Sequence, residues 1–220
     1  MPGTLYIVST PIGNLTDITL RAIETLKTVG LIAWEDTRHT KILLDRYGIK
    51  TPTTSFFEYN KIQKADYLLR QLKEGRSVAL VSDAGTPGIS DPGHNIIKLA
   101  IDNTIPIVAI PGPAAFVTAL VVSGKPTHKF TFEGFLSNKS QARKNRLKVL
   151  KEEGRTAVLY ESPHRIIKLL EDILAVYGDI TVVLARELTK KFEDVRREKV
   201  GVLLSHFKAT PPRGEFIVVI

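Results

Sequence analysis

Short apolar runs alternate with helical patterns through the first half of the chain. Four runs are apolar at consecutive positions, which is typical of strands buried on both faces of a parallel sheet. They lie at residues 5–8, 31–34, 78–81 and 107–110. The apolar spacing between and around them predicts helices over residues 18–27, 40–47, 65–73 and 96–101, the first with Asp17 as its N-cap. This βαβα order predicts an α/β fold with right-handed crossovers.

The pattern changes after the Gly124-Lys125-Pro126-Thr127 segment. Strands are predicted beyond it at residues 130–132, 156–160, 181–184 and 216–220, and helices at 141–150 and 165–176. We therefore predict two α/β lobes. The lobe at 1–124 contains the parallel sheet, and the lobe at 125–220 carries a basic segment.

Composition excludes several kinds of chemistry. The 220 residues contain no cysteine, which excludes disulfides, thiolate zinc sites, iron–sulfur ligation and a cysteine nucleophile. The five histidines show no metal-ligand spacing, so we expect no metal. No secretory signal or membrane-spanning run is apparent, which predicts a cytoplasmic protein. The formal charge of +8 suggests an anionic partner, with nucleic acid ahead of acidic lipid; a basic surface that meets only solvent is the alternative.

The stretch at residues 82–93 is the most informative segment. It follows a predicted buried strand and precedes a helix, so it lies at the carboxyl end of the sheet, where open α/β folds bind ligands. Its three glycines allow close backbone approach, and Asp83 and Asp91 can accept hydrogen bonds. We interpret it as a ligand loop, although an ordinary strand-to-helix turn has a similar composition.

Two further turns follow predicted strands, at residues 9–15 and 111–115, and we expect all three to face one crevice. Neither the G-x-G-x-x-G nor the G-K-[ST] phosphate motif is present. This argues against a nicotinamide dinucleotide or a nucleoside triphosphate and favours a nucleoside ligand without phosphate.

Eight short motifs occur in an order that is typical of one family. They are Thr10-Pro11-Ile12-Gly13-Asn14-Leu15, Glu35-Asp36-Thr37-Arg38-His39-Thr40, residues 82–93, Pro111-Gly112-Pro113, Glu133-Gly134-Phe135-Leu136, Glu161-Ser162-Pro163-His164-Arg165, Arg186-Glu187-Leu188-Thr189-Lys190 and Gly214-Glu215. On these motifs the sequence resembles the tetrapyrrole methylase superfamily, and within it the methyltransferases that modify a cytidine 2′-hydroxyl of 16S rRNA.

The resemblance implies S-adenosylmethionine bound in a cleft between two α/β lobes, a homodimer, and 16S rRNA or the small ribosomal subunit as partner. It implies that cofactor-binding residues come from both lobes. Those expected are Thr10, Pro11, Asp83, Ala84, Gly85, Thr86, Ile89, Pro111, Gly112, Pro113, Ala114 and Ala115, with Leu136, Tyr160 and Gly214 from the second lobe. The chain departs from the family pattern at Ser9 and Ser137, where members commonly have proline.

A ribose 2′-hydroxyl is a poor nucleophile until its proton is withdrawn, so we looked for groups that could assist the transfer. The catalytic candidates are Glu35, Asp36, Arg38, His39 and Glu187, with His164 and Glu215 as further proton acceptors. For Asp36 or Thr37 a helix N-cap is an equally good interpretation.

Basic residues concentrate in residues 137–155, where seven basic and two acidic side chains give +5 of the +8. Lys139, Arg143, Lys144 and Arg146 are predicted to contact RNA, because helical spacing lets such side chains follow a phosphate backbone. A solvated helix face is the alternative. Two other functions remain open at this stage: a methylase of a tetrapyrrole or another small molecule, and a non-catalytic RNA-binding module.

Overall fold

The computed structural model describes residues 1–34, 37–56, 61–91 and 93–220, without the side chains of 37–40 and 61–63. The chain forms two compact units, Met1–Ala114 and Ala115–Ile220. The boundary predicted at residues 124–125 lies later than this division. The difference is helix α5 (Ala115–Ser123), which packs on strands of the second unit.

The first unit is built on a parallel sheet with the strand order β3-β2-β4-β1-β5. Its strands are β1 (Leu5–Val8), β2 (Leu31–Trp34), β3 (Thr53–Ser55), β4 (Val78–Leu80) and β5 (Ile107–Ile110). The four predicted strands and their parallel arrangement are confirmed, but β5 is not buried on both faces: it is an edge strand in which Val108 and Ala109 are exposed. Strand β3 was not predicted, because its sequence, Thr-Thr-Ser, contains no apolar residue.

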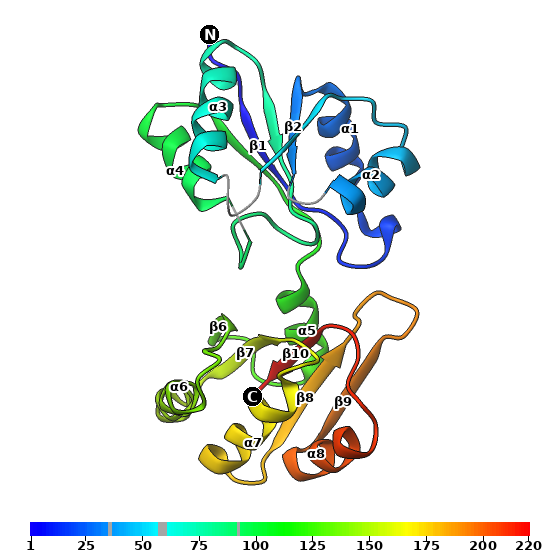
Figure 1. Ribbon diagram of the computed structural model, residues 1–220, viewed down its shortest axis with the longest axis vertical. Helices are drawn as coiled ribbons and strands as arrows, with labels where there is room; N and C mark the ends of the chain where they lie inside the picture. The colour runs from blue at the N-terminus through cyan, green and yellow to red at the C-terminus, as the bar shows by residue number, and fades with distance from the viewer. Residues whose placement is uncertain (35–36, 57–60, 92) are drawn as a thin grey trace. The chain divides into compact units, whose positions relative to one another are not determined.

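Helices cover both faces of this sheet (Figure 1). They are α1 (Leu20–Thr28), α2 (Thr37–Arg46), α3 (Lys61–Lys73) and α4 (His94–Asp102). Alternate strand residues enter two separate apolar clusters, as the two-residue period of a strand requires. Leu31 and Leu80 pack with α3 and α4, whereas Ile32 and Ala79 pack with α1 and α2.

The first helix begins two residues later than predicted. Asp17 ends a short 3-10 turn, Leu15–Asp17, which Asn14 caps through its side chain. The N-cap of α1 is Thr19, whose Oγ1 accepts a hydrogen bond from the N–H of Ala22 at 3.1 Å. Asp17 as N-cap was therefore wrong, because a threonine closer to the apolar stripe takes that position.

The second unit contains a mixed sheet with the order β6-β7-β10-β8-β9. Its elements after α5 are β6 (Phe130–Phe135), α6 (Ser140–Glu153), β7 (Thr156–Glu161), α7 (Ile166–Tyr177), β8 (Thr181–Arg186), β9 (Asp194–Lys199), α8 (Val200–Ala209) and β10 (Phe216–Val219). Strand β9 escaped prediction because it is a polar edge strand, and α8 because its apolar face is not strongly periodic.

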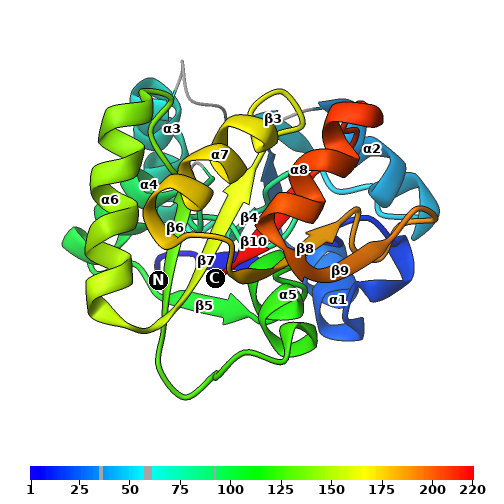
Figure 2. The same cartoon turned by 90° about the horizontal axis from the view of Figure 1, so that it is seen from below.

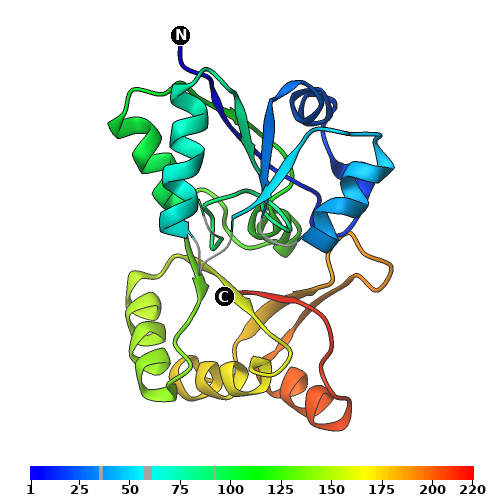
Figure 3. The same cartoon turned by 45° about the horizontal axis from the view of Figure 1, so that its top comes forward.

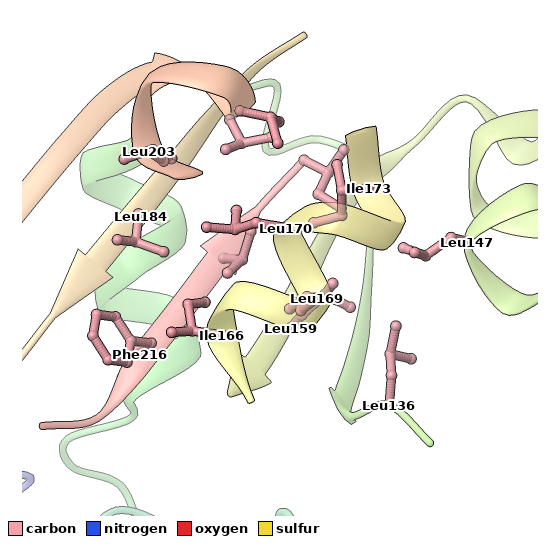
Figure 4. Packing of buried hydrophobic residues seen from close by; sticks show 14 of the residues in the cluster. Leu136, Leu147, Leu159, Ile166, Leu169, Leu170, Ile173, Leu184, Leu203 and Phe216 are labelled. Atoms are coloured by element: carbon pink, nitrogen blue, oxygen red, sulfur yellow. The ribbon is translucent and has the colours of Figure 1, made fainter. Parts of the chain in front are cut away.

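The apolar core of the second unit lies between its sheet and helices α6, α7 and α8 (Figure 4). Leu159 and Leu184 of the strands meet Leu147 of α6, Leu169 of α7 and Leu203 of α8 there. Helix α5 contacts β7 and β10 and lies on the other face of the sheet (Figure 2). None of the described helices is long and apolar enough to cross a bilayer.

Helix α7 starts at Ile166, one residue after the predicted start at residue 165. The residues before it form a turn in which the carbonyl of Ser162 accepts hydrogen bonds from the N–H groups of Arg165 and Ile166.

Candidate functional site

The three ligand turns expected in the first unit lie side by side. They follow β1, β4 and β5, which are neighbours in the order β4-β1-β5, and the carboxyl ends of parallel strands share one edge of a sheet. Strand adjacency therefore brings the turns at residues 9–15, 82–93 and 111–115 together, as predicted from their common position after a strand.

Two of these turns are joined by a backbone bridge. Thr10 N–H donates to the carbonyl of Gly85 at 2.8 Å, and Gly85 N–H donates to the carbonyl of Thr10 at 3.0 Å. The buried hydroxyl of Thr10 donates to the carbonyl of Ser82 at 2.9 Å. The Oγ atoms of Ser9 and Thr86 lie 2.8 Å apart. These bonds hold the turn after β1 and the turn after β4 in one arrangement.

The third turn meets the first through a glycine. A Cβ added to Gly112 would lie 2.9 Å from the Cβ of Ser9, which is closer than real Cβ contacts. At Gly112 only glycine allows the backbones to approach this closely. Gly85 favours glycine for another reason, its φ of +79°; a Cβ there would lie 3.6 Å from Ile12 and 3.8 Å from the carbonyl of Pro113, so this position also neighbours the first and third turns.

Exposed backbone and carboxylate groups surround this junction. Asp83, Ala84, Pro111 and Gly112 are exposed, whereas Thr10 beside them is buried. The hydroxyl and amino groups of a nucleoside can form hydrogen bonds with the carbonyls, N–H groups and carboxylate of such a rigid site.

Asp91 belongs to the same loop and is half-buried. Burial raises its pKa from 3.8 to about 6, the hydrogen bond with Ser82 opposes this, and the charge of Asp83 adds to it. The carboxyl group of Asp91 therefore titrates near pH 6, above the usual range of an aspartate.

In the second unit, three phenylalanine rings cluster with the ring of Tyr160. The ring of Phe132 lies 5.0 Å from that of Tyr160, and the ring of Phe135 lies 5.7 Å from it, both in edge-on orientations. Phe116 stacks on Phe132 at 4.6 Å, and its N–H donates to the hydroxyl oxygen of Tyr160 at 3.2 Å. Tyr160 is thereby fixed against the start of α5.

Leu136, the other residue expected from this part of the chain, is buried, and a charged pair holds its backbone. Its carbonyl accepts a hydrogen bond from Nη2 of Arg165 at 2.5 Å, and Nε of Arg165 lies 3.2 Å from Oε1 of Glu161. The side chain of Glu161 has no exposed surface, and this burial raises its pKa, although the N–H of Ser162 and the charge of Arg165 oppose the shift. The motif at residues 161–165 is visible in the sequence, but the structural role of Glu161 was not predicted from it.

Glu187 is engaged in a cluster with Lys190, Gly214 and Glu215. Its Oε1 accepts hydrogen bonds from Nζ of Lys190 at 3.1 Å and from the N–H of Glu215 at 3.0 Å. Burial alone would raise the pKa of Glu187, but these hydrogen bonds lower it overall. A Cβ on Gly214 would lie 2.6 Å from the Glu187 side chain. This geometry favours a structural role over proton abstraction for Glu187.

The structure describes the other catalytic candidates only in part. Glu35 and Asp36 lie outside the described residues. Arg38 and His39 lie in α2, with their side chains outside the description. Of the two additional proton acceptors, His164 is exposed and Glu215 bonds to Lys190 at 2.7 Å.

The predicted RNA-contacting residues divide into buried and exposed groups. Arg143 is only 2% exposed and pairs with Asp172, its Nη2 lying 2.6 Å from the carboxylate. Its prediction as an RNA contact was wrong, because the helix turns this guanidinium into the protein. Arg146 forms a bidentate pair with Glu133 and keeps 40% of its side chain exposed. Lys139 is exposed, and Lys144 is half-buried at 3.4 Å from Asp172.

Two serines that support the turns were not predicted. Ser9 and Ser82 are both buried; the Ser9 hydroxyl lies 2.8 Å from that of Thr86 in the neighbouring turn, whereas the Ser82 hydroxyl donates to the carbonyl of Gly85 within its own turn. The available signal was a polar residue directly after each apolar run, where a buried hydroxyl requires a partner.

A family profile and comparison with individual proteins both relate this chain to methyltransferases. The profile of the family described as Tetrapyrrole (Corrin/Porphyrin) Methylases matches residues 4–203. The chain is 49% identical to Ribosomal RNA small subunit methyltransferase I of Escherichia coli O157:H7, over 99% of this chain and 77% of that protein. It is also 49% identical to the protein of the same name from Thermotoga maritima, over 99% and 98%.

Solved structures share the fold at low sequence identity. A diphthine synthase superposes with a TM-score of 0.77 at 15% identity, covering 99% of this chain and 90% of that one. A cobalt precorrin-4 methyltransferase gives a TM-score of 0.74 at 16% identity, covering 98% and 94%.

We predict that Asp91→Asn flattens the pH dependence of stability between about pH 4 and pH 6. The folded protein holds the Asp91 proton more tightly than the unfolded chain does, so the free energy of unfolding falls as the pH rises through this window. Urea unfolding at several pH values measures this, with Asp66→Asn on α3 as control for a lost carboxylate. A difference between wild type and Asp91→Asn that stays constant with pH would contradict the assignment.

Proposed function

Because this chain belongs to the tetrapyrrole methylase family, we propose that it transfers a methyl group from S-adenosylmethionine to a cytidine 2′-hydroxyl of 16S rRNA. The observation that carries the proposal is its 46–49% identity, over nearly the whole chain, to methyltransferases named for small-subunit ribosomal RNA. A protein that methylates rRNA would act in the cytoplasm. The same similarity favours RNA over a tetrapyrrole as the acceptor.

The turns of the first unit are suited to hold the nucleoside part of this donor. Exposed Asp83 and the backbone of Pro111 and Gly112 offer acceptors and donors next to the rigid Thr10–Gly85 bridge. We assign the cofactor residues expected in these turns to this role, whereas Leu136, Tyr160 and Gly214 stay predictions from the family resemblance. The bound donor supplies an electrophilic sulfonium methyl group.

The residues of the chain then have two tasks, to orient the acceptor hydroxyl and to take its proton. Positioning accounts for up to ~7–11 kcal/mol of the barrier, and a general base for a further ~10²–10⁴-fold in rate. We propose Glu35, Asp36 and His39 as proton acceptors, with Arg38 contacting the RNA phosphate. Glu187 instead holds the start of β10 in place through Glu215.

RNA contacts around α6 are proposed for the lysines rather than for Arg143. Lys139 precedes the helix and Lys148 lies on it, and both are exposed, so they can reach phosphates without breaking an ion pair. Lys144 is half-buried and would have to leave Asp172, and Arg146 would have to share its charge between Glu133 and a phosphate.

A homodimer is the further part of the proposal. Helix α5 is apolar all round, and Val117, Val121 and Val122 remain 45%, 70% and 39% exposed. An apolar helix face of this kind is typical of a protein interface, and we propose a second copy of the chain as its partner.

Gly85→Leu is expected to weaken S-adenosylmethionine binding by at least about tenfold, or ~1.4 kcal/mol, and to abolish transfer of tritiated methyl to under-modified small subunits. Gly178→Leu is the matched control, because Gly178 has the same φ of +79° but open space around it. Calorimetry measures the binding. Wild-type affinity in Gly85→Leu would remove this turn from the cofactor site.

Replacing Lys139, Lys144 and Lys148 with alanine should weaken RNA binding and reduce its salt dependence. Each lost phosphate contact lowers the slope of log K against log salt by about 0.7–0.9. Lys27→Ala and Lys73→Ala, which remove exposed charges from the first unit, serve as controls. An unchanged slope in the triple variant would exclude α6 from the RNA interface.

Val121→Glu should convert the protein from dimer to monomer, since it places a charge on the most exposed of the three valines. Sedimentation velocity measures this. A wild-type protein that sediments as a monomer would refute the dimer.

A further inference from the structure

The loop between β8 and β9, residues 187–193, carries an aromatic ring that the fold does not bury. Phe192 is 66% exposed, although phenylalanine is among the residues most often buried in proteins. Nζ of Lys191 lies 5.7 Å from the centroid of this ring, within cation–π distance. Figures 1 and 3 show the loop in orange, extending past the ends of the neighbouring strands of the second unit.

This loop is held in a single conformation by hydrogen bonds. The N–H of Lys190 donates to the carbonyl of Glu187 at 3.0 Å, and the N–H of Glu193 donates to the carbonyl of Lys190 at 3.1 Å. The N–H of Thr189 donates to Oε2 of Glu193 at 2.5 Å. Leu188 anchors the loop by burying its side chain. Hydrogen bonds and the buried Leu188 side chain therefore hold the loop that carries the exposed Phe192 ring.

The conformation is also costly for the residues that adopt it. Glu187 and Thr189 have φ values of +50° and +68°, in the left-handed region that favours glycine. Such conformations persist where surrounding contacts enforce them, and they concentrate at functional sites. Both residues belong to the turn that leaves Phe192 exposed.

The hairpin at residues 186–199 is positive on balance, with six basic and four acidic side chains. Glu187 pairs with Lys190 and Asp194 with Arg196, whereas exposed Glu193, next to Phe192, accepts a hydrogen bond from the N–H of Thr189. Lys191, over the ring, and Arg197 are exposed. A single exposed ring with a cation over its face differs from the core of a protein interface, which is depleted of charge. The combination of a ring and adjacent cations is typical of surfaces that bind unpaired nucleic acid.

We propose that Phe192 and Lys191 form a contact site for an unpaired nucleotide of the RNA substrate. The ring stacks on the face of a base, and the Lys191 ammonium lies against the adjacent phosphate. This inference rests on the proposed function and specifies which part of the second unit holds single-stranded RNA. Because every base has a stacking face, the site tolerates different sequences and requires only that the base be unpaired.

The test compares Phe192→Leu, which keeps apolar volume but loses the aromatic face, with Phe192→Tyr, which keeps it. Binding of a short fluorescein-labelled single-stranded RNA is measured by anisotropy, with the duplex of the same sequence in parallel. Phe192→Leu should raise the Kd for the single strand about tenfold, and Phe192→Tyr should bind like wild type. Lys191→Ala should lower the salt slope by about 0.7. Ile101→Ala, at a 63% exposed position on α4, is the control.

Equal Kd values for the Leu and Tyr variants would overturn the inference. A changed oligomeric state in Phe192→Leu would also overturn it, because the ring would then contact a second copy. A methyl-transfer assay of the wild type on small subunits shows whether only the stacking site fails or the proposed function fails too. If the wild type transfers methyl and both variants bind equally, only the stacking site fails; if the wild type transfers none, the proposed function fails as well.

Discussion

Two peptide groups that lie 75 residues apart in the chain, at Thr10 and Gly85, form a reciprocal pair of hydrogen bonds beyond the ends of β1 and β4. Parallel strands are joined by long crossovers, so no hairpin fixes the relation between their end turns. The bridge supplies that relation, and the buried Thr10 hydroxyl strengthens it by bonding to Ser82. Because unpaired buried polar groups are costly, the alternatives in which these turns separate are disfavoured. The arrangement of the candidate cofactor site depends on this pairing.

The second unit fixes its loops with buried charge instead of a backbone bridge. Arg143 pairs with Asp172, and Arg165 pairs with Glu161 while bonding to the carbonyl of Leu136. Buried ion pairs contribute little net stability, because desolvation offsets the attraction, but losing one partner is strongly destabilising. Their effect here is to hold the end of β6 and the start of α7 in one geometry.

Charge in this protein therefore has two separate uses. Arg143 and Arg165 organise the interior, whereas Lys139, Lys148 and Lys191 remain at the surface. A net charge of +8 does not distinguish these groups. Of these residues, only the surface lysines can attract RNA: Lys139 lies just before α6, Lys148 on it, and Lys191 in the loop between β8 and β9. RNA binding through both elements would place single-stranded and phosphate contacts on the same unit.

The sequence by itself determined the local elements and the chemistry of the turns. Consecutive apolar residues specify the parallel strands, and glycine, proline and aspartate after them specify the turns that follow, because these are properties of neighbouring residues. The motifs also sufficed to identify the family. Tertiary structure decided which strands are neighbours, and hence that Thr10 meets Gly85. It also decided that Arg143 faces Asp172 rather than solvent, and that a strand as polar as β9 joins the sheet. Adjacency, burial and edge pairing depend on contacts between distant residues, which no local pattern contains.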